Sequence, residues 1–152
     1  HNLPIMKELL YLKDEQIKDF IRLIFYSYKE IFSDPKEILS KKLFGLAHLR
    51  ALYLIEQFPG IGVSELMFKL KITKQSLNRV LRELIKSKTI KQLKDDNDTR
   101  KKKLFLDRDG KLFFEKVYES QKKRVFYALQ NSEPDSVIKF KQLLSRIIDG
   151  AK

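Results

Sequence analysis

One stretch, from Gly60 to Gly110, constrains the fold of this chain more than any other part of the sequence. Pro59-Gly60 ends a half-apolar helix that we predict from Leu46 to Phe58. The spacing of apolar residues then predicts another helix from Gly62 to Leu70, and Lys71-Ile72 forms a sharp turn before the next helix begins. This arrangement is typical of a helix-turn-helix.

The helix after the turn has two contrasting faces. Thr73 caps its start, since the hydroxyl oxygen of Thr can accept a backbone N–H, and the helix runs to about Ser87. Its apolar residues are spaced to form a face on the core: Leu77, Val80, Leu81 and Leu84. Four polar residues at i, i+3, i+4 and i+7 share the other face: Gln75, Asn78, Arg79 and Arg82.

Two short strands follow, and the loop between them is charged. We predict strands from Ile90 to Leu93 and from Lys103 to Leu106, with a turn at Asp95-Asp96-Asn97-Asp98. A hairpin placed after two such helices forms a wing. The expected fold class is therefore mainly α with a small β wing, a winged helix-turn-helix flanked by further helices at both ends.

The polar face of the second helix suits a DNA groove. Amide and guanidinium groups near the start of a recognition helix read base edges, with Gln suited to adenine and Arg to guanine. The expected base contacts are Gln75, Ser76, Asn78 and Arg79. The expected phosphate contacts are Thr73, Lys74 and Arg82. The alternative for this face is ordinary exposure to solvent.

The wing supplies a second cationic element. Arg100 to Lys103 are four consecutive cations, and an Arg at a hairpin tip can enter the minor groove, whose negative potential attracts it. Asp98 can hold the Arg100 guanidinium by a charge-assisted pair. The wing residues expected to act are Asp98, Arg100, Lys101 and Lys102. The alternative is a charged loop that only keeps the protein soluble.

The distribution of charge favours nucleic acid as the partner. The chain carries a formal net charge of +12, which favours a polyanion: nucleic acid first and an anionic membrane second. Residues 69–103 hold thirteen Lys+Arg and only four Asp+Glu, so most of the excess lies in the predicted helix-turn-helix and wing. The amides and short hydroxyls on the second helix are unlike the polar face of a membrane-surface helix.

Several classes of protein are excluded by what the sequence lacks. With no cysteine there is no disulfide, thiolate metal site or thiol redox sensor, which fits a reducing cytoplasm. We find no signal peptide or apolar stretch of membrane-spanning length, and expect a cytoplasmic protein. Two histidines, His1 and His48, do not favour a zinc site. No nucleophile motif or phosphate-binding Gly loop is present, so we expect neither an enzyme nor a cofactor.

Further segments flank this region on both sides. They are Leu3–Leu12 (an arm or short helix), Asp14–Phe32 with Asp14 as its cap, the polar connection Pro35–Lys42, Arg108–Leu129 with Asp107 as its cap, and Asp135–Asp149.

Together these motifs resemble the MarR family of bacterial transcription regulators. The family pattern is a Ser/Thr-Lys start to the recognition helix, an Asp-x-x-Asp-x-Arg wing, and Leu-Thr-x-x-Gly opening the next helix. The corresponding residues follow without a gap: Thr73-Lys74, then Asp95, Asp98 and Arg100, then Leu106-Asp107-Arg108-Asp109-Gly110. The chain departs from the pattern at Lys88 (usually Gly), Asn97 (often Arg) and Asp107 (usually Thr).

The resemblance covers nearly the whole chain and implies a homodimer. Residues 1–45 would form an N-terminal arm and dimerisation helix, residues 46–110 the DNA-binding lobe, and residues 111–152 the C-terminal dimerisation helices, all in one compact chain. Two recognition helices would reach successive major grooves, about 34 to 36 Å apart, on a pseudo-palindromic operator, with repression as the expected outcome. The alternative is that the apolar terminal helices fold back on their own domain.

The resemblance also implies a crevice for a small aromatic effector. The aromatic residues in the corresponding helices are Phe20, Tyr28, Phe44, His48, Tyr53, Phe113 and Tyr118. Aromatic residues at helical spacing equally suit a core. Two other functions also stay open: an architectural or replication-type winged-helix DNA binder with similar affinity for any duplex, and a winged-helix module for protein interaction.

Overall fold

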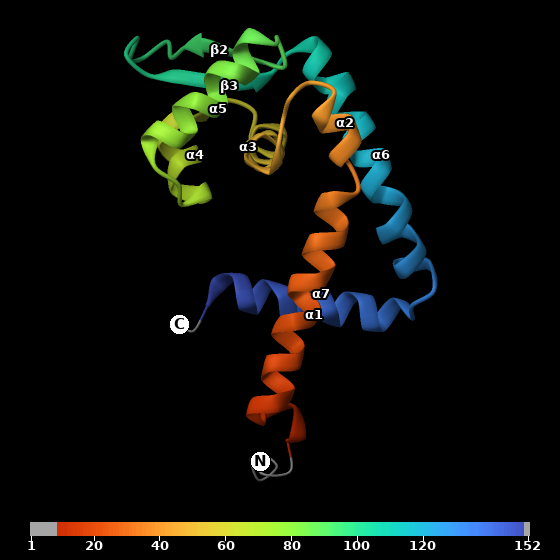
Figure 1. The fold of residues 1–152 in the computed structure, drawn as a ribbon. Helices are drawn as coiled ribbons and strands as arrows, with labels where there is room; N and C mark the ends of the chain where they lie inside the picture. The colour runs from red at the N-terminus through yellow and green to blue at the C-terminus, as the bar shows by residue number, and fades with distance from the viewer. Residues whose placement is uncertain (1–8, 151–152) are drawn as a thin grey trace. The chain divides into compact units, whose positions relative to one another are not determined.

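The computed structural model describes residues 9–150, which form two compact units (Figure 1). The smaller unit ends at Asp34 and the larger begins at Pro35. The predicted fold class is confirmed: the chain is mostly helical and has one small antiparallel sheet. No helix among residues 9–150 is long and apolar enough to cross a membrane.

The smaller unit consists of a 3₁₀ turn and one long helix. The turn, η2, spans Leu10–Leu12, and helix α1 spans Asp14–Ser33. Asp14 was expected to cap α1, but it is the first helical residue; the N-cap is Lys13, whose side chain makes no capping bond. No residue of α1 is buried. Most of the predicted arm, residues 3–8, lies outside the described residues.

The larger unit begins with a short helix. The predicted polar connection contains a five-residue helix, α2 (Lys36–Ser40), which buries Leu39. Helix α3 spans Leu46–Gln57 and supplies much of the core, since Leu49, Ala51 and Leu52 are fully buried. The helix ends where Pro59-Gly60 was expected to stop it.

The helix-turn-helix consists of α4 (Val63–Leu70) and α5 (Lys74–Lys86). Lys71 makes the turn by adopting a left-handed conformation, with φ at 54°. Both helices pack on α3. The exit of α5 is closed by two backbone bonds, from Lys88 N to Ile85 O and from Thr89 N to Leu84 O, which form the Schellman motif.

Lys88 takes the left-handed conformation that this motif requires, with φ at 60°. Gly is favoured at such a position because a Cβ atom is strained there. The helix therefore ends where the MarR-like pattern ends it, although Lys stands in place of Gly.

The sheet has three strands rather than the two that form the predicted hairpin. Strands β2 (Ile90–Lys94) and β3 (Lys102–Leu106) pair antiparallel, from Ile90 opposite Leu106 to Lys94 opposite Lys102. On its other side β3 pairs with β1 (Ile61–Gly62), which precedes α4. Two residues are too few to show the alternation by which strands are recognised in a sequence.

Two helices complete the larger unit: α6 (Arg108–Gln130) and α7 (Pro134–Asp149). Asp107 caps α6 as predicted, because its carboxylate accepts the Arg108 N–H at 2.8 Å. Gly110 permits a close approach of α6 to the segment after α5, since a Cβ there would lie 1.8 Å from the Thr89 carbonyl oxygen. In Figure 1, α6 leads away from the sheet and the chain then turns into α7.

Candidate nucleic-acid interface

The predicted division of α5 into two faces is confirmed. Its four apolar residues are buried: Leu77, Val80, Leu81 and Leu84. The residues of α5 that were predicted to contact DNA are all exposed: Lys74, Gln75, Ser76, Asn78, Arg79 and Arg82. Because the apolar face is anchored on the core, the exposed face has a fixed orientation in the larger unit.

Thr73 fixes the start of α5. Its Oγ1 accepts the Ser76 backbone N–H at 3.2 Å and donates to Ser76 Oγ at 2.9 Å. The Thr73 hydroxyl is therefore used within the cap, whereas the Ser76 hydroxyl proton stays available to an external acceptor. Lys74 and Gln75, the first two residues of α5, are both exposed. The N–H groups at the start of a helix can bind an anion.

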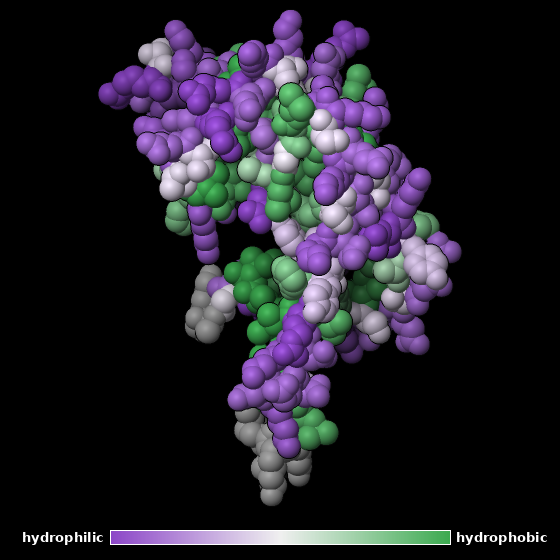
Figure 2. All heavy atoms as spheres, viewed as in Figure 1, coloured by the Kyte–Doolittle hydropathy of each residue, from purple (hydrophilic) through white to green (hydrophobic). Residues whose placement is uncertain are grey.

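The wing between β2 and β3 is a compact turn. Asp95 N donates to Lys101 O at 3.0 Å, Lys101 N donates to Asp98 O at 2.9 Å, and Asn97 N donates to the Asp95 carboxylate at 2.8 Å. Figure 2 shows that hydrophilic residues dominate the end of the larger unit that carries this loop. The hairpin thus presents its charges on an ordered turn.

The predicted pair of Asp98 and Arg100 is present and is bidentate. Arg100 Nε lies 3.1 Å from Asp98 Oδ1 and Nη2 lies 3.3 Å from Oδ2, while the Arg100 backbone N–H donates to Oδ1 at 3.0 Å. These bonds, the side-chain bond first, hold the pKa of Asp98 below its ordinary value. The Arg100 side chain is 89% exposed, so the pair orients the guanidinium without burying it.

The aromatic residues predicted for an effector crevice lie in both units. Phe20 and Tyr28 belong to α1 in the smaller unit. In the larger unit, Phe44 stacks on His48 with centroids 4.7 Å apart and meets Phe113 edge-on at 5.8 Å. These three rings are buried against one another, as core residues are.

Two further crevice residues, Tyr53 and Tyr118, lie on α3 and α6. Tyr53 donates its hydroxyl to the buried Gln121 and meets Phe114 edge-on, and burial raises its pKa, with a smaller contribution from Glu56. Tyr118 is 42% exposed.

The structure has a hollow of about 430 Å³ in a different place. It lies between the end of α3, the sheet and the start of α6, and none of the seven predicted residues lines it. The predicted effector site therefore stays a prediction. No group of His, Asp or Glu residues in the described part of the chain could hold a metal ion.

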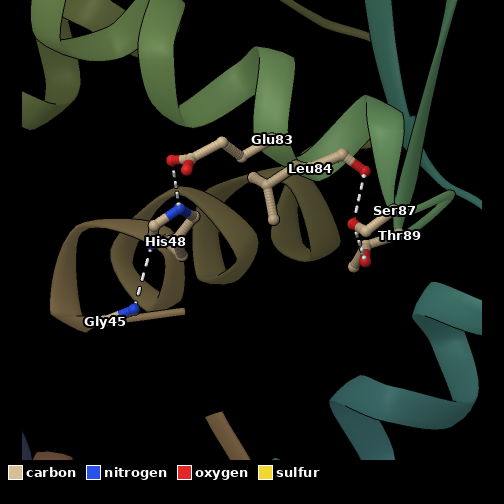
Figure 3. Close-up of polar contacts among 6 residues, drawn as sticks. All are labelled: Gly45, His48, Glu83, Leu84, Ser87 and Thr89. Atoms are coloured by element: carbon tan, nitrogen blue, oxygen red, sulfur yellow. Dashed lines mark hydrogen bonds and ion pairs between the residues drawn. The ribbon is translucent and has the colours of Figure 1, made fainter. Parts of the chain in front are cut away.

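One polar contact on the α3 side of α5 was not predicted. Glu83 of α5 reaches His48 of α3, with Oε1 of Glu83 3.0 Å from Nε2 of His48 (Figure 3). The two residues are 35 positions apart, so no local spacing could have indicated the pair. A second contact that was not predicted is local: the hydroxyl groups of Ser87 and Thr89, just after α5, form a hydrogen bond of 2.8 Å.

Comparisons with known proteins agree with this geometry. A sequence model of the MarR family matches residues 45–102. The HTH-type transcriptional regulator PetP of Rhodobacter capsulatus is 36% identical over 148 residues, covering 97% of this chain and 89% of PetP.

Solved structures share the fold. FabT of Streptococcus pneumoniae in complex with DNA has a TM-score of 0.73 at 16% identity, covering 90% of this chain and 96% of that chain. A mutant MarR from E. coli complexed with operator DNA has a TM-score of 0.64 at 23% identity, covering 87% and 95%. With 36% identity to PetP over nearly its whole length and a match to the family model across the helix-turn-helix and wing, this chain belongs to the MarR family of winged helix-turn-helix transcriptional regulators.

Proposed function

We propose that this protein is a transcriptional repressor that binds a pseudo-palindromic DNA operator as a homodimer. The observation that carries the proposal is the polar face of α5, whose base-reading candidates Gln75, Asn78 and Arg79 are all exposed on a helix anchored to the core. Amide and guanidinium groups on a fixed helix face match the donor and acceptor pattern of the major groove.

The wing supports the same proposal from a second position. Arg100 is held by Asp98 and stays exposed, and Lys101 is exposed beside it. A preoriented guanidinium suits the narrow minor groove next to the major-groove site. FabT and the MarR mutant, which share the fold, have both been solved with DNA.

Dimerisation is proposed because the terminal helices have apolar faces that this chain leaves open. No residue of α1 or α7 is buried. The large apolar residues of these helices that are at least about half exposed are Ile21, Leu23, Phe25, Tyr26, Ile138, Phe140, Ile147 and Ile148. Apolar exposure on this scale marks an interaction surface. We propose that a second copy of the chain covers it, because a two-fold symmetric dimer matches the symmetry of a pseudo-palindromic operator.

Release by a small aromatic effector, and a cytoplasmic location, stay predictions. For the effector, the relevant measurement is the change in operator affinity on adding simple aromatic acids, with the thermal midpoint of the protein followed in parallel.

The proposal is tested by selecting bound fragments from a random genomic duplex library near physiological salt and sequencing them. An enriched pseudo-palindrome with half-sites about one helical turn apart is the expected result. Strong binding at low salt with no enriched sequence would contradict the proposal and would indicate an architectural DNA binder. Failure to bind duplex DNA under either condition would favour the protein-interaction module.

A further inference from the structure

Both ring nitrogens of His48 are used in hydrogen bonds. Nδ1 accepts the backbone N–H of Gly45 at 3.0 Å, and Nε2 lies 3.0 Å from Glu83 Oε1 (Figure 3). An N–H donor faces Nδ1 and a carboxylate faces Nε2, so the network fits the neutral tautomer that carries its proton on Nε2. In this tautomer His48 caps the start of α3 and donates to α5 at the same time.

The imidazole ring has little freedom to turn away from Glu83. It is stacked on Phe44 at an interplanar angle of 15°, and Phe44 in turn meets Phe113. The His48 side chain is only 10% exposed, whereas that of Glu83 is 49% exposed. A rigid buried donor thus holds the end of a flexible, partly exposed carboxylate.

Glu83 is four residues after Arg79 on the same helix. Residues at i and i+4 are neighbours on a helix surface, and opposite charges at this spacing attract each other. Arg79 and Arg82 nevertheless form no ion pair within residues 9–150. The carboxylate nearest to Arg79 in the sequence of α5 is bonded to His48 instead.

We propose that His48 is a positioning residue for DNA binding, which holds the Glu83 carboxylate away from Arg79 and so leaves the Arg79 guanidinium free for a base edge. This inference rests on the proposed function, in which Arg79 reads a base. The Glu83 carboxylate has two possible partners. One is the imidazole N–H of His48 on α3, and the other is the guanidinium of Arg79, one turn earlier on α5.

The expected effect is modest, because an exposed i, i+4 ion pair is weak. Release of Glu83 onto Arg79 should reduce operator affinity roughly twofold for each recognition helix, and roughly fourfold for a dimer. Affinity for random DNA should change much less, since the Arg79 charge matters most where it bonds a base. The ratio of operator affinity to random-duplex affinity is therefore the quantity to measure.

Three variants separate this role from simple packing. His48→Gln can still accept the Gly45 N–H, because Gln at the third helical position makes that bond in a capping box, but it cannot also reach Glu83. Glu83→Ala removes the carboxylate and leaves His48 in place. The double variant, His48→Gln with Glu83→Ala, removes both the imidazole and the carboxylate.

The proposal expects the operator-to-random ratio to fall roughly fourfold in His48→Gln. The ratio should stay at the wild-type value in Glu83→Ala and return to it in the double variant. A purely mechanical link between α3 and α5 predicts something else: equal losses in both single variants and no recovery in the double variant. That result, or an unchanged ratio in His48→Gln, would overturn the proposal.

A second measurement needs no DNA. Long-range ¹H–¹⁵N spectra of the folded wild-type protein should show His48 protonated on Nε2, with a ring signal that changes in Glu83→Ala. Protonation on Nδ1, or no change in that variant, would overturn the proposal even if His48→Gln did not fold. If the wild-type protein showed no preference for any sequence while the spectra showed the expected tautomer, the proposed function would fail and the His48–Glu83 bond would stand.

Discussion

Helices α5 and α7 are both amphipathic, yet their apolar faces meet different surroundings. In α5 four apolar residues are buried on the core of the larger unit. In α7 no residue is buried, and Ile138, Phe140 and Ile147 are each about half exposed. Helix α1 resembles α7 in having no buried residue.

The difference shows what an amphipathic pattern determines. The spacing of apolar residues defines which face of a helix turns away from water, but it does not say which molecule covers that face. For α5 the cover is α3 and the rest of the core. For α1 and α7 we propose a second copy of the chain. The effect of a mutation on the free energy of unfolding should therefore depend on protein concentration when the mutation lies in α1 or α7, but not when it lies in α5.

The largest effect on stability is expected from a substitution on the buried face of α5. Leu84 is fully buried, so Leu84→Ala should lower the free energy of unfolding by about 2 to 5 kcal/mol at any protein concentration. The measurement is urea unfolding at several concentrations. In the matched variant Leu143→Ala, on α7, the loss of stability should be largest where both proteins are dimeric and should shrink as the protein is diluted through the dissociation constant of the dimer. A concentration-independent loss there would contradict the comparison.

A charge placed on the exposed apolar face of α7 should weaken the proposed dimer. Phe140 is 49% exposed in the single chain, and Phe140→Asp should weaken the dimer by at least about 30-fold because the aspartate would have to be buried at the interface. Sedimentation equilibrium measures this change. Phe68 of α4 is 81% exposed, and Phe68→Asp should leave the dimer intact. Equal weakening by both substitutions would mean that α7 is not the interface.

The exposed face of α5 gives the next largest effect. Arg79→Ala should reduce operator affinity by about 1 to 3 kcal/mol and relax the preference at one base pair. In the wing, Lys101→Ala should instead weaken binding to all sequences alike and lower the salt slope by about 1 for each phosphate that is no longer neutralised. Titrations of operator and random duplexes at several salt concentrations distinguish the two. Equal reductions on both duplexes for Arg79→Ala would contradict its base contact.

The smallest effect is expected at the wing pair. Arg100 lowers the pKa of Asp98, so this carboxylate stays ionised to a lower pH than an ordinary Asp does. The ion pair is therefore fully formed at pH values above about 4, the ordinary pKa of Asp. As the pH falls through the lowered pKa, Asp98 protonates and the ion pair breaks. A carbon-13 titration of the Asp98 carboxyl should show this directly. An ordinary midpoint would contradict the pair.

At neutral pH, Asp98→Asn should reduce operator affinity by less than about fivefold, because an exposed ion pair is weak. Lys101→Ala, in the same wing, is the matched control, since it removes a neighbouring charge and leaves both partners of the Asp98–Arg100 pair in place.

Much of the fold followed from local sequence signals. The periodicity of α5, its Thr73 cap, the Asp107 cap of α6 and the wing with its Asp98–Arg100 pair are all interactions within a few residues, so short patterns indicated them. The Asp14 cap was wrong because a favourable residue type stood one position inside the helix.

Features that depend on distant residues could not be predicted. Strand β1 exists because Ile61 lies opposite Leu104, and a two-residue strand has no pattern of its own. The His48–Glu83 bond and the close approach of Gly110 to Thr89 join segments brought together only by folding. The aromatic pattern of Phe44, His48 and Phe113 indicated burial but not whether a ligand or the protein itself covers the rings.

The most direct test of the account is operator affinity as a function of half-site spacing. Two α5 helices held by one dimer should require half-sites about 10 to 10.5 base pairs apart, centre to centre. Inserting about five base pairs places the half-sites on opposite faces of the duplex, and we predict that affinity falls roughly 100-fold or more. Affinity that does not change with spacing would contradict a dimeric, groove-reading repressor.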